Sequence, residues 1–182
     1  MATHGQLTAA MGKSLELWLV PLGYKILYDH GDKEKSNVGN IVCWFGDDPR
    51  PKRETELTQL DIAVVKRVFG RPQTVALIEI EESDDRPKTL LGDLFGILLA
   101  DHVAFRGEEL GVDARTELIL IARGPEAHEP RMERLLAKVR ECRGRMVGGG
   151  GAIGHIAGEL FNEERQLEET LKRLLQEAIV RF

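Results

Sequence analysis

The chain has 182 residues, of which 42% are hydrophobic and 5% aromatic, and its formal net charge is -5. These values predict one compact domain with a sizeable core, and they exclude a disordered or fibrous chain. The sequence has no run of roughly 18 apolar residues and no secretory signal at its start, so we expect a cytoplasmic protein with no membrane partner.

In chain order, the patterns of apolar, glycine and proline residues predict a helix, three strands, a helix, a strand and two further helices. The approximate ranges are 8–20, 40–45, 57–70, 75–81, 83–105, 116–122, 126–143 and, for the last helix, residues beyond the glycine cluster at 148–151. Short links between the three strands favour a meander. The predicted fold class is therefore α/β, with a mixed sheet of about four strands flanked by helices.

Composition divides the chain into two parts. Residues 1–146 are expected to form the α/β core, and residues 147–182 a glycine-rich joint and a long amphipathic helix. The apolar stripe of this helix consists of Leu167, Leu171, Leu174, Leu175, Ala178 and Ile179. The stripe either closes the core of the same domain or pairs with a second subunit in a homodimer.

Three carboxylates interrupt apolar strands. Glu79 and Glu81 in "VALIEIEES" project from one face, because strand side chains alternate, and Asp61 lies in the preceding strand, in "QLDIAVV". If the two strands pair, these acids meet in a partly buried cleft, where they stay charged only beside a cation or strong donors. A divalent metal ion would meet that need. The alternative is a strand face that is exposed to water.

The placement of these acids resembles the PD-(D/E)XK nuclease superfamily, which includes many restriction endonucleases. Its core is a helix, a three-stranded meander, a helix and a strand, with acids in the first helix and in the second and third strands. The corresponding residues here are Glu16 in "KSLELWLV", Asp61, and Glu79 with Glu81 in "IEIEES". The resemblance implies a restriction endonuclease-like core that binds Mg²⁺ or Mn²⁺. Its ligands would be Asp61, Glu79, the carbonyl of Ile80 and, through water, Glu16.

One position departs from this resemblance, which covers residues 10–125. Glu81 stands where the family usually has lysine. Either Glu81 orients or deprotonates the attacking water, or Lys88 in the first turn of the next helix supplies the missing cation. If neither does so, the fold is retained without catalysis.

Cations for a nucleic-acid partner are concentrated in two segments. At helical spacing Arg134 and Lys138 share a face, Arg145 lies on about the same side further along, and Lys52 and Arg53 lie in an exposed loop. They could contact the phosphates of DNA or, as the second choice, RNA. Charge runs on helices are also typical of solvated faces, and the acidic total charge disfavours nucleic acid.

Three functional hypotheses follow. The first is a divalent-metal-dependent nuclease that acts on DNA or, less favoured, on RNA. The second is a catalytically silent nuclease-fold module that binds nucleic acid or a protein partner. The third is an unrelated α/β protein whose strand acids face water.

Overall fold

The computed structural model describes residues 5–83, 85–143 and 153–182. Its helices are α1 (Gln6–Leu19), η1 (Val20–Leu22), α2 (Pro87–Leu98), η2 (Glu126–His128), α3 (Glu129–Arg143) and α4 (Glu164–Arg181). Its strands are β1 (Tyr24–Tyr28), β2 (Ile41–Trp44), β3 (Glu56–Leu60), β4 (Ile62–Val68), β5 (Arg71–Glu81), β6 (His102–Phe105), β7 (Glu108–Glu109), β8 (Glu117–Arg123) and β9 (His155–Phe161). No helix in these ranges has the length and apolar character needed to cross a membrane.

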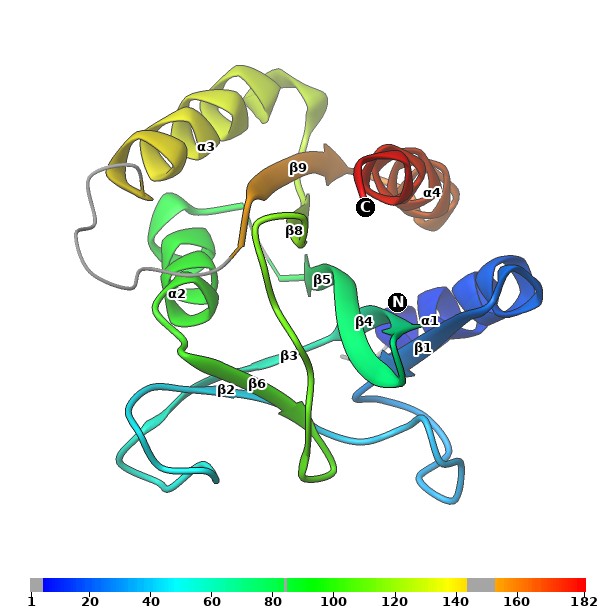
Figure 1. The fold of residues 1–182 in the computed structure, drawn as a ribbon. Helices are drawn as coiled ribbons and strands as arrows, with labels where there is room; N and C mark the ends of the chain where they lie inside the picture. The colour runs from blue at the N-terminus through cyan, green and yellow to red at the C-terminus, as the bar shows by residue number, and fades with distance from the viewer. Residues whose placement is uncertain (1–4, 84, 144–152) are drawn as a thin grey trace.

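Five strands form a central mixed sheet in the order β1-β4-β5-β8-β9. β1, β4 and β5 are antiparallel neighbours, whereas β5, β8 and β9 run parallel. α1 and α4 pack on one face of this sheet, and α2 and α3 pack on the other (Figure 1). The predicted mixed α/β architecture is therefore confirmed, with five strands in the main sheet instead of about four.

A second sheet, in the order β3-β2-β6-β7, shares a core cluster with α2 and the central sheet. The predicted meander of three consecutive strands is therefore wrong in its first strand. β2 pairs with β3 and β6 in the second sheet, and β1 is the strand that pairs with β4. The single strand predicted at residues 57–70 is divided at Asp61 into β3 and β4, which belong to different sheets. β2 buries Ile41 and Cys43 in the core cluster that includes α2, which explains its place in a separate layer.

Two further boundaries differ from the prediction. The helix expected at residues 83–105 ends at Leu98, and its last part forms strand β6. The segment expected to be only a joint and a helix contains β9, which pairs with β8. A Cβ on Gly158 would lie 2.5 Å from the carbonyl oxygen of Leu120, so glycine is needed where β9 approaches β8. The glycine cluster at 148–151 lies outside the described residues.

The apolar stripe of α4 closes the core, which is the first of the two alternatives. Leu167, Leu171, Leu174, Leu175 and Ala178 are all buried in the cluster that α4 forms with α1 and the central sheet. β9 and α4 thus belong to the same core as the strands before them. The homodimer remains a prediction.

Candidate metal centre

Asp61 lies at the junction between β3 and β4, at one end of the central sheet. Only 7% of its surface is exposed. Its Oδ2 accepts a hydrogen bond from the backbone N–H of Ile80 on β5 (2.8 Å), and its Oδ1 accepts one from the Oγ1 of Thr8 on α1 (3.1 Å). Both donors are neutral, so they orient the carboxylate without neutralising its charge.

Glu79 on β5 belongs to the same acidic end of the sheet. It alternates with Ile78 and Ile80, whose side chains lie in the cluster on the other face, so it projects toward the α2 side. Its Oε2 is buried and has no hydrogen-bond partner among the described residues. Burial raises the pKa of Glu79 well above its ordinary value, and the charge of Asp61 raises it further.

The carboxyl group of Asp61 shows the same resistance to ionisation. Burial raises its pKa to about 6, the hydrogen bond from Ile80 lowers it, and the charge of Asp29 raises it. Thr8 and His30 contribute smaller lowering effects. Asp61 and Glu79 are therefore two interacting acids in a poorly hydrated place, and a cation between them would favour their charged forms.

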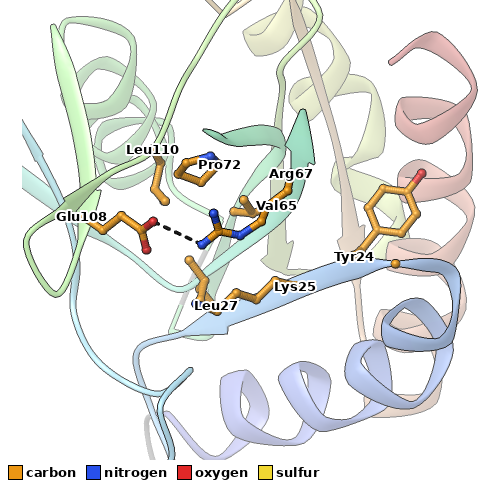
Figure 2. Close-up of a pocket in the computed structure, with 9 residues that line it drawn as sticks. Tyr24, Lys25, Leu27, Val65, Arg67, Pro72, Glu108 and Leu110 are labelled. Atoms are coloured by element: carbon orange, nitrogen blue, oxygen red, sulfur yellow. Dashed lines mark ion pairs between the residues drawn. The ribbon is translucent and has the colours of Figure 1, made fainter. Parts of the chain in front are cut away.

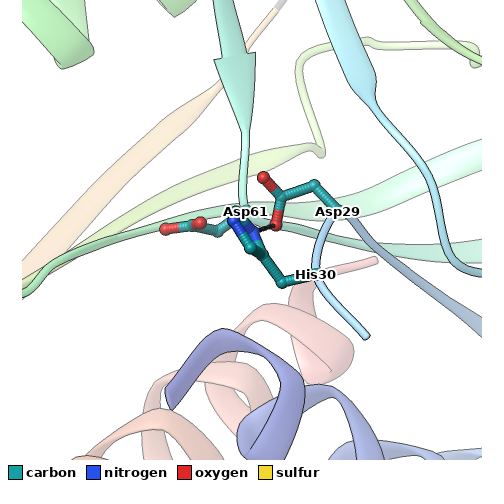
Figure 3. A group of neighbouring side chains, drawn as sticks. All are labelled: Asp29, His30 and Asp61. Carbon is teal, nitrogen blue, oxygen red and sulfur yellow. Dashed lines mark hydrogen bonds and ion pairs between the residues drawn. The ribbon is translucent and has the colours of Figure 1, made fainter. Parts of the chain in front are cut away.

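Asp29 and His30 follow β1, and they were not predicted as site residues. The backbone N–H of Asp29 donates to the carbonyl of Asp61 (3.0 Å), which joins the ends of β1 and β4. Asp29, His30 and Asp61 each offer one ligand atom, and these atoms all lie within 4.8 Å of one another (Figure 3). The Nδ1 of His30 is hydrogen-bonded to the carboxylate of Asp29. The sequence signal for this group is an Asp-His pair directly after the short apolar run "YKILY".

The start of α1 fits closely against His30. Gly5 precedes the helix with a φ of +83°, a conformation that favours glycine, and a Cβ there would lie 2.0 Å from the Cδ2 of the His30 ring. Glycine thus lets the imidazole pack against the N-terminus of α1. From the same helix, Thr8 reaches Asp61, so α1 positions two members of the group.

The residues predicted to replace the family's lysine lie at the end of β5 and in the first turn of α2. Glu81 is half-buried, and its Oε1 accepts hydrogen bonds from the backbone N–H and the Oγ of Ser83, both at 2.6 Å. Asp93 on α2 is a further acid, whose pKa burial and the charge of Glu81 raise to about 6. Lys88 is exposed in the first turn of α2. The catalytic roles of Glu81 and Lys88 remain predictions.

Neither Glu16 nor Glu79 is part of the Asp29–His30–Asp61 group. The carboxylate of Glu16 accepts hydrogen bonds from the hydroxyl of Tyr28 (3.2 Å) and from the side-chain amide of Asn37. Burial and the neighbouring charge of Glu16 raise the pKa of Tyr28 to about 12. Glu16 therefore holds the loop after β1 in place, and its predicted water-mediated contact with a metal remains a prediction.

The predicted nucleic-acid contacts are mostly exposed. Arg134 and Lys138 lie on the outer side of α3, where Lys138 pairs with Glu141 at 2.8 Å. Lys52 forms an ion pair with Asp48 at 2.7 Å, and Arg53 is exposed in the same loop. Arg145 lies outside the described residues. These cations are accessible, and their contact with phosphates stays a prediction.

A pocket on the central sheet is distinct from this group. It is lined by residues from the start of β1, the end of β4 and the start of β5, and the ion pair of Arg67 with Glu108 (3.7 Å) crosses it (Figure 2). Because β1, β4 and β5 are antiparallel neighbours, these positions lie at the opposite end of the strands from Asp29, Asp61 and Glu79. The pocket therefore contributes nothing to the acidic group.

Comparisons with protein-family models, curated proteins and solved structures found no match to this chain. A functional argument therefore depends on the geometry of the acidic group and on the chemistry of its residues.

Proposed function

We propose that the chain is a divalent-metal-dependent nuclease that hydrolyses phosphodiester bonds in DNA. The observation that carries this proposal is the pair of buried Asp61 and half-buried Glu79, whose Oε2 is buried. Their carboxylates interact and form no ion pair with a lysine or arginine in the described ranges. Buried charges persist when they are paired or coordinate a metal. A doubly charged cation is the compensation that such a pair lacks.

The order of elements supports the same proposal. α1 is followed by the antiparallel strands β1, β4 and β5, then by α2 and the parallel strand β8. This is the succession that the resemblance to PD-(D/E)XK nucleases implies, with β2 and β3 inserted after β1, and β6 and β7 inserted after α2. Asp61 precedes the second strand of the series, and Glu79 lies near the end of the third, as the resemblance also implies.

The residues present fit the metal ion that a nuclease of this kind needs. Asp61 and Glu79 supply hard oxygen ligands, and the Glu79 Oε2 has no other partner in the described ranges. When bound, Mg²⁺ or Mn²⁺ would activate water and stabilise the charge that develops on the phosphate. Thr8 and the N–H of Ile80 would keep the Asp61 carboxylate oriented, and the Ile80 carbonyl is the further ligand that the resemblance suggests.

A proton acceptor for the attacking water is available next to these ligands. Glu81 follows Glu79 by two residues, so it projects from the same face of β5, and Ser83 fixes one of its oxygens. In the proposed reaction, either Glu81 orients or deprotonates the water, or Lys88 supplies the missing cation from the start of α2.

The test is cleavage of linear, supercoiled, single-stranded and branched DNA, with an RNA substrate alongside, in the presence and absence of Mg²⁺ or Mn²⁺. Cleavage should need the metal and fall by at least about a hundredfold in Asp61→Asn and Glu79→Gln. The matched control is Glu164→Gln, which removes an exposed carboxylate of α4 and should cleave normally. Cleavage that persists with chelator, or in both folded site variants, contradicts the proposal.

A second function is favoured by one observation, the acid at the position of the usual lysine. With Glu81 there and Lys88 exposed, the chain could keep the fold and bind nucleic acid or a protein partner without cutting. That function predicts DNA binding without hydrolysis under every metal condition. Gel-shift and cleavage assays on the same samples separate the two functions.

A further inference from the structure

We propose that Asp29 and His30 are ligands of the same metal centre and that the centre prefers Mn²⁺ to Mg²⁺. This inference rests on the metal site of the proposed nuclease, but it concerns residues that neither the sequence pattern nor the resemblance assigned. The centre would then take donors from the ends of three neighbouring strands. Asp29 and His30 follow β1, Asp61 precedes β4, and Glu79 lies near the end of β5.

The first support is the geometry of the three side chains. One ligand atom each from Asp29, His30 and Asp61 lies within 4.8 Å of the other two, and Figure 3 shows the three side chains next to one another, with the Asp29 carboxylate against the His30 ring. The backbone hydrogen bond between Asp29 and Asp61 (3.0 Å) fixes the ends of their strands relative to each other. The ligand group is therefore carried by paired backbone, which suits a preorganised centre.

The second support is independent of these three residues. The Oε2 of Glu79 is buried and has no hydrogen-bond partner among the described residues. The charges of Asp61, Asp93 and Asp29 act on the Glu79 carboxylate, so Glu79 lies near Asp61 and α2, outside the group of ligand atoms within 4.8 Å of one another. A bound cation would give this oxygen the partner that the described part of the chain does not supply.

The preference for Mn²⁺ follows from the donors. Three carboxylates alone would suit Mg²⁺, which takes oxygen ligands and keeps several waters. An imidazole nitrogen suits first-row transition ions, whereas carboxylates suit Mn²⁺ and Mg²⁺ alike. Of Mn²⁺ and Mg²⁺, the two ions of the proposed nuclease, Mn²⁺ is therefore the one that accepts the imidazole more readily, and His30 is the residue that distinguishes between them.

The surroundings of His30 hold the ring where a ligand is needed. Gly5 leaves room for the imidazole against the start of α1, and the carboxylate of Asp29 contacts Nδ1. A purely structural role for His30 would also explain this packing. The two roles differ in one respect, because only a ligand changes the ratio of Mn²⁺ to Mg²⁺ affinity.

Isothermal titration of the full chain with Mn²⁺ and with Mg²⁺ measures that ratio in the wild type, His30→Asn and Asp29→Asn. Wild type should bind Mn²⁺ at least about tenfold more tightly than Mg²⁺. His30→Asn should lose about 10- to 100-fold in Mn²⁺ affinity and change little toward Mg²⁺, and Asp29→Asn should weaken both ions. The matched control is His155→Asn, an exposed histidine at the start of β9, which should leave both affinities unchanged.

A second measurement uses only the wild-type protein, so its result does not depend on whether a variant folds. Pulsed electron paramagnetic resonance of bound Mn²⁺ should show coupling to an imidazole ¹⁴N nucleus. Absence of that coupling, or a folded His30→Asn that keeps the wild-type affinity ratio, overturns the inference. Mn²⁺ binding through nitrogen without DNA cleavage would instead contradict only the proposed function, and metal-dependent cleavage without nitrogen coupling would contradict only this inference.

Discussion

The two ends of the central sheet both bury carboxylates, and they compensate them differently. Where β8 begins, Glu117 is 3% exposed and forms an ion pair with Arg181 in the last turn of α4. Where β4 begins and β5 ends, Asp61 and Glu79 receive only neutral donors from the described residues. The difference teaches that the chain supplies its own cation where a buried acid serves the fold. At the other end, the described residues supply no such cation, and we propose that a metal ion compensates the two acids.

Removal of the ion pair between Glu117 and Arg181 should produce the largest change in the free energy of unfolding. Arg181→Met leaves the buried carboxylate of Glu117 without its partly exposed cation, and a buried charged acceptor left without its partner costs about 3 kcal/mol of unfolding free energy. Urea denaturation measures the loss. The double variant Glu117→Gln/Arg181→Met is the control and should recover most of it, because both charges are gone. A single variant within about 0.5 kcal/mol of wild type would mean that the pair is not needed.

At the end of the sheet that contains Asp61, removal of a charge should raise the free energy of unfolding instead of lowering it. Asp61→Asn removes a buried charge while its amide can still bond to Ile80 and Thr8, so without metal at pH 7 it should stabilise the protein. A rise in pKa from 3.8 to about 6 corresponds to a gain of about 1 to 3 kcal/mol, measured by urea denaturation with chelator present. Destabilisation by this variant would show that the negative charge of Asp61 is already compensated.

The pH dependence of the unfolding free energy, compared between wild type and Asp61→Asn, isolates the contribution of the raised Asp61 pKa. Because the folded-state pKa of Asp61 is raised from 3.8 to about 6, the unfolded chain loses its proton first as the pH rises. Wild type without metal should therefore lose stability relative to Asp61→Asn between about pH 4 and pH 6, and the difference should level off above that range. Below about pH 4 both proteins should be nearly equal in stability. A difference that is constant across this range contradicts the raised pKa.

The smallest predicted effect concerns the surface of α3. If Arg134 contacts a phosphate, Arg134→Gln should lower the slope of log affinity against log salt by about one. DNA binding measured at several salt concentrations gives this slope. Arg165→Gln on α4 is the matched control, because it removes an exposed arginine on the opposite side of the sheet. Equal slopes in both variants would mean that α3 presents an ordinary solvated face.

Local patterns were sufficient for much of this fold. The alternation in β5, the continuous apolar run of β8 and the amphipathic stripe of α4 predicted elements that the structure contains. Pairing partners were not predictable in the same way, because a meander assumes that consecutive strands are neighbours. β2 breaks that assumption by burying Ile41 and Cys43 in a second layer beside α2.

The same limit explains the partial prediction of the site. Asp61 and Glu79 stood out because each interrupts an apolar run, and the structure brings them close enough for their charges to interact. Asp29 and His30 directly follow the five-residue strand β1. The sequence shows this pair after "YKILY", but it does not show the pairing of β1 with β4 that brings the pair beside Asp61. Their position depends on the pairing of β1 with β4 across an inserted segment of more than thirty residues.

The most direct test of the central claim is a crystal structure of the protein with Mn²⁺, with anomalous data collected to locate the ion. The account predicts an anomalous peak within bonding distance of carboxylate oxygens of both Asp61 and Glu79. Peaks confined to other parts of the surface, with these two carboxylates unchanged and without a bound ion, would contradict it.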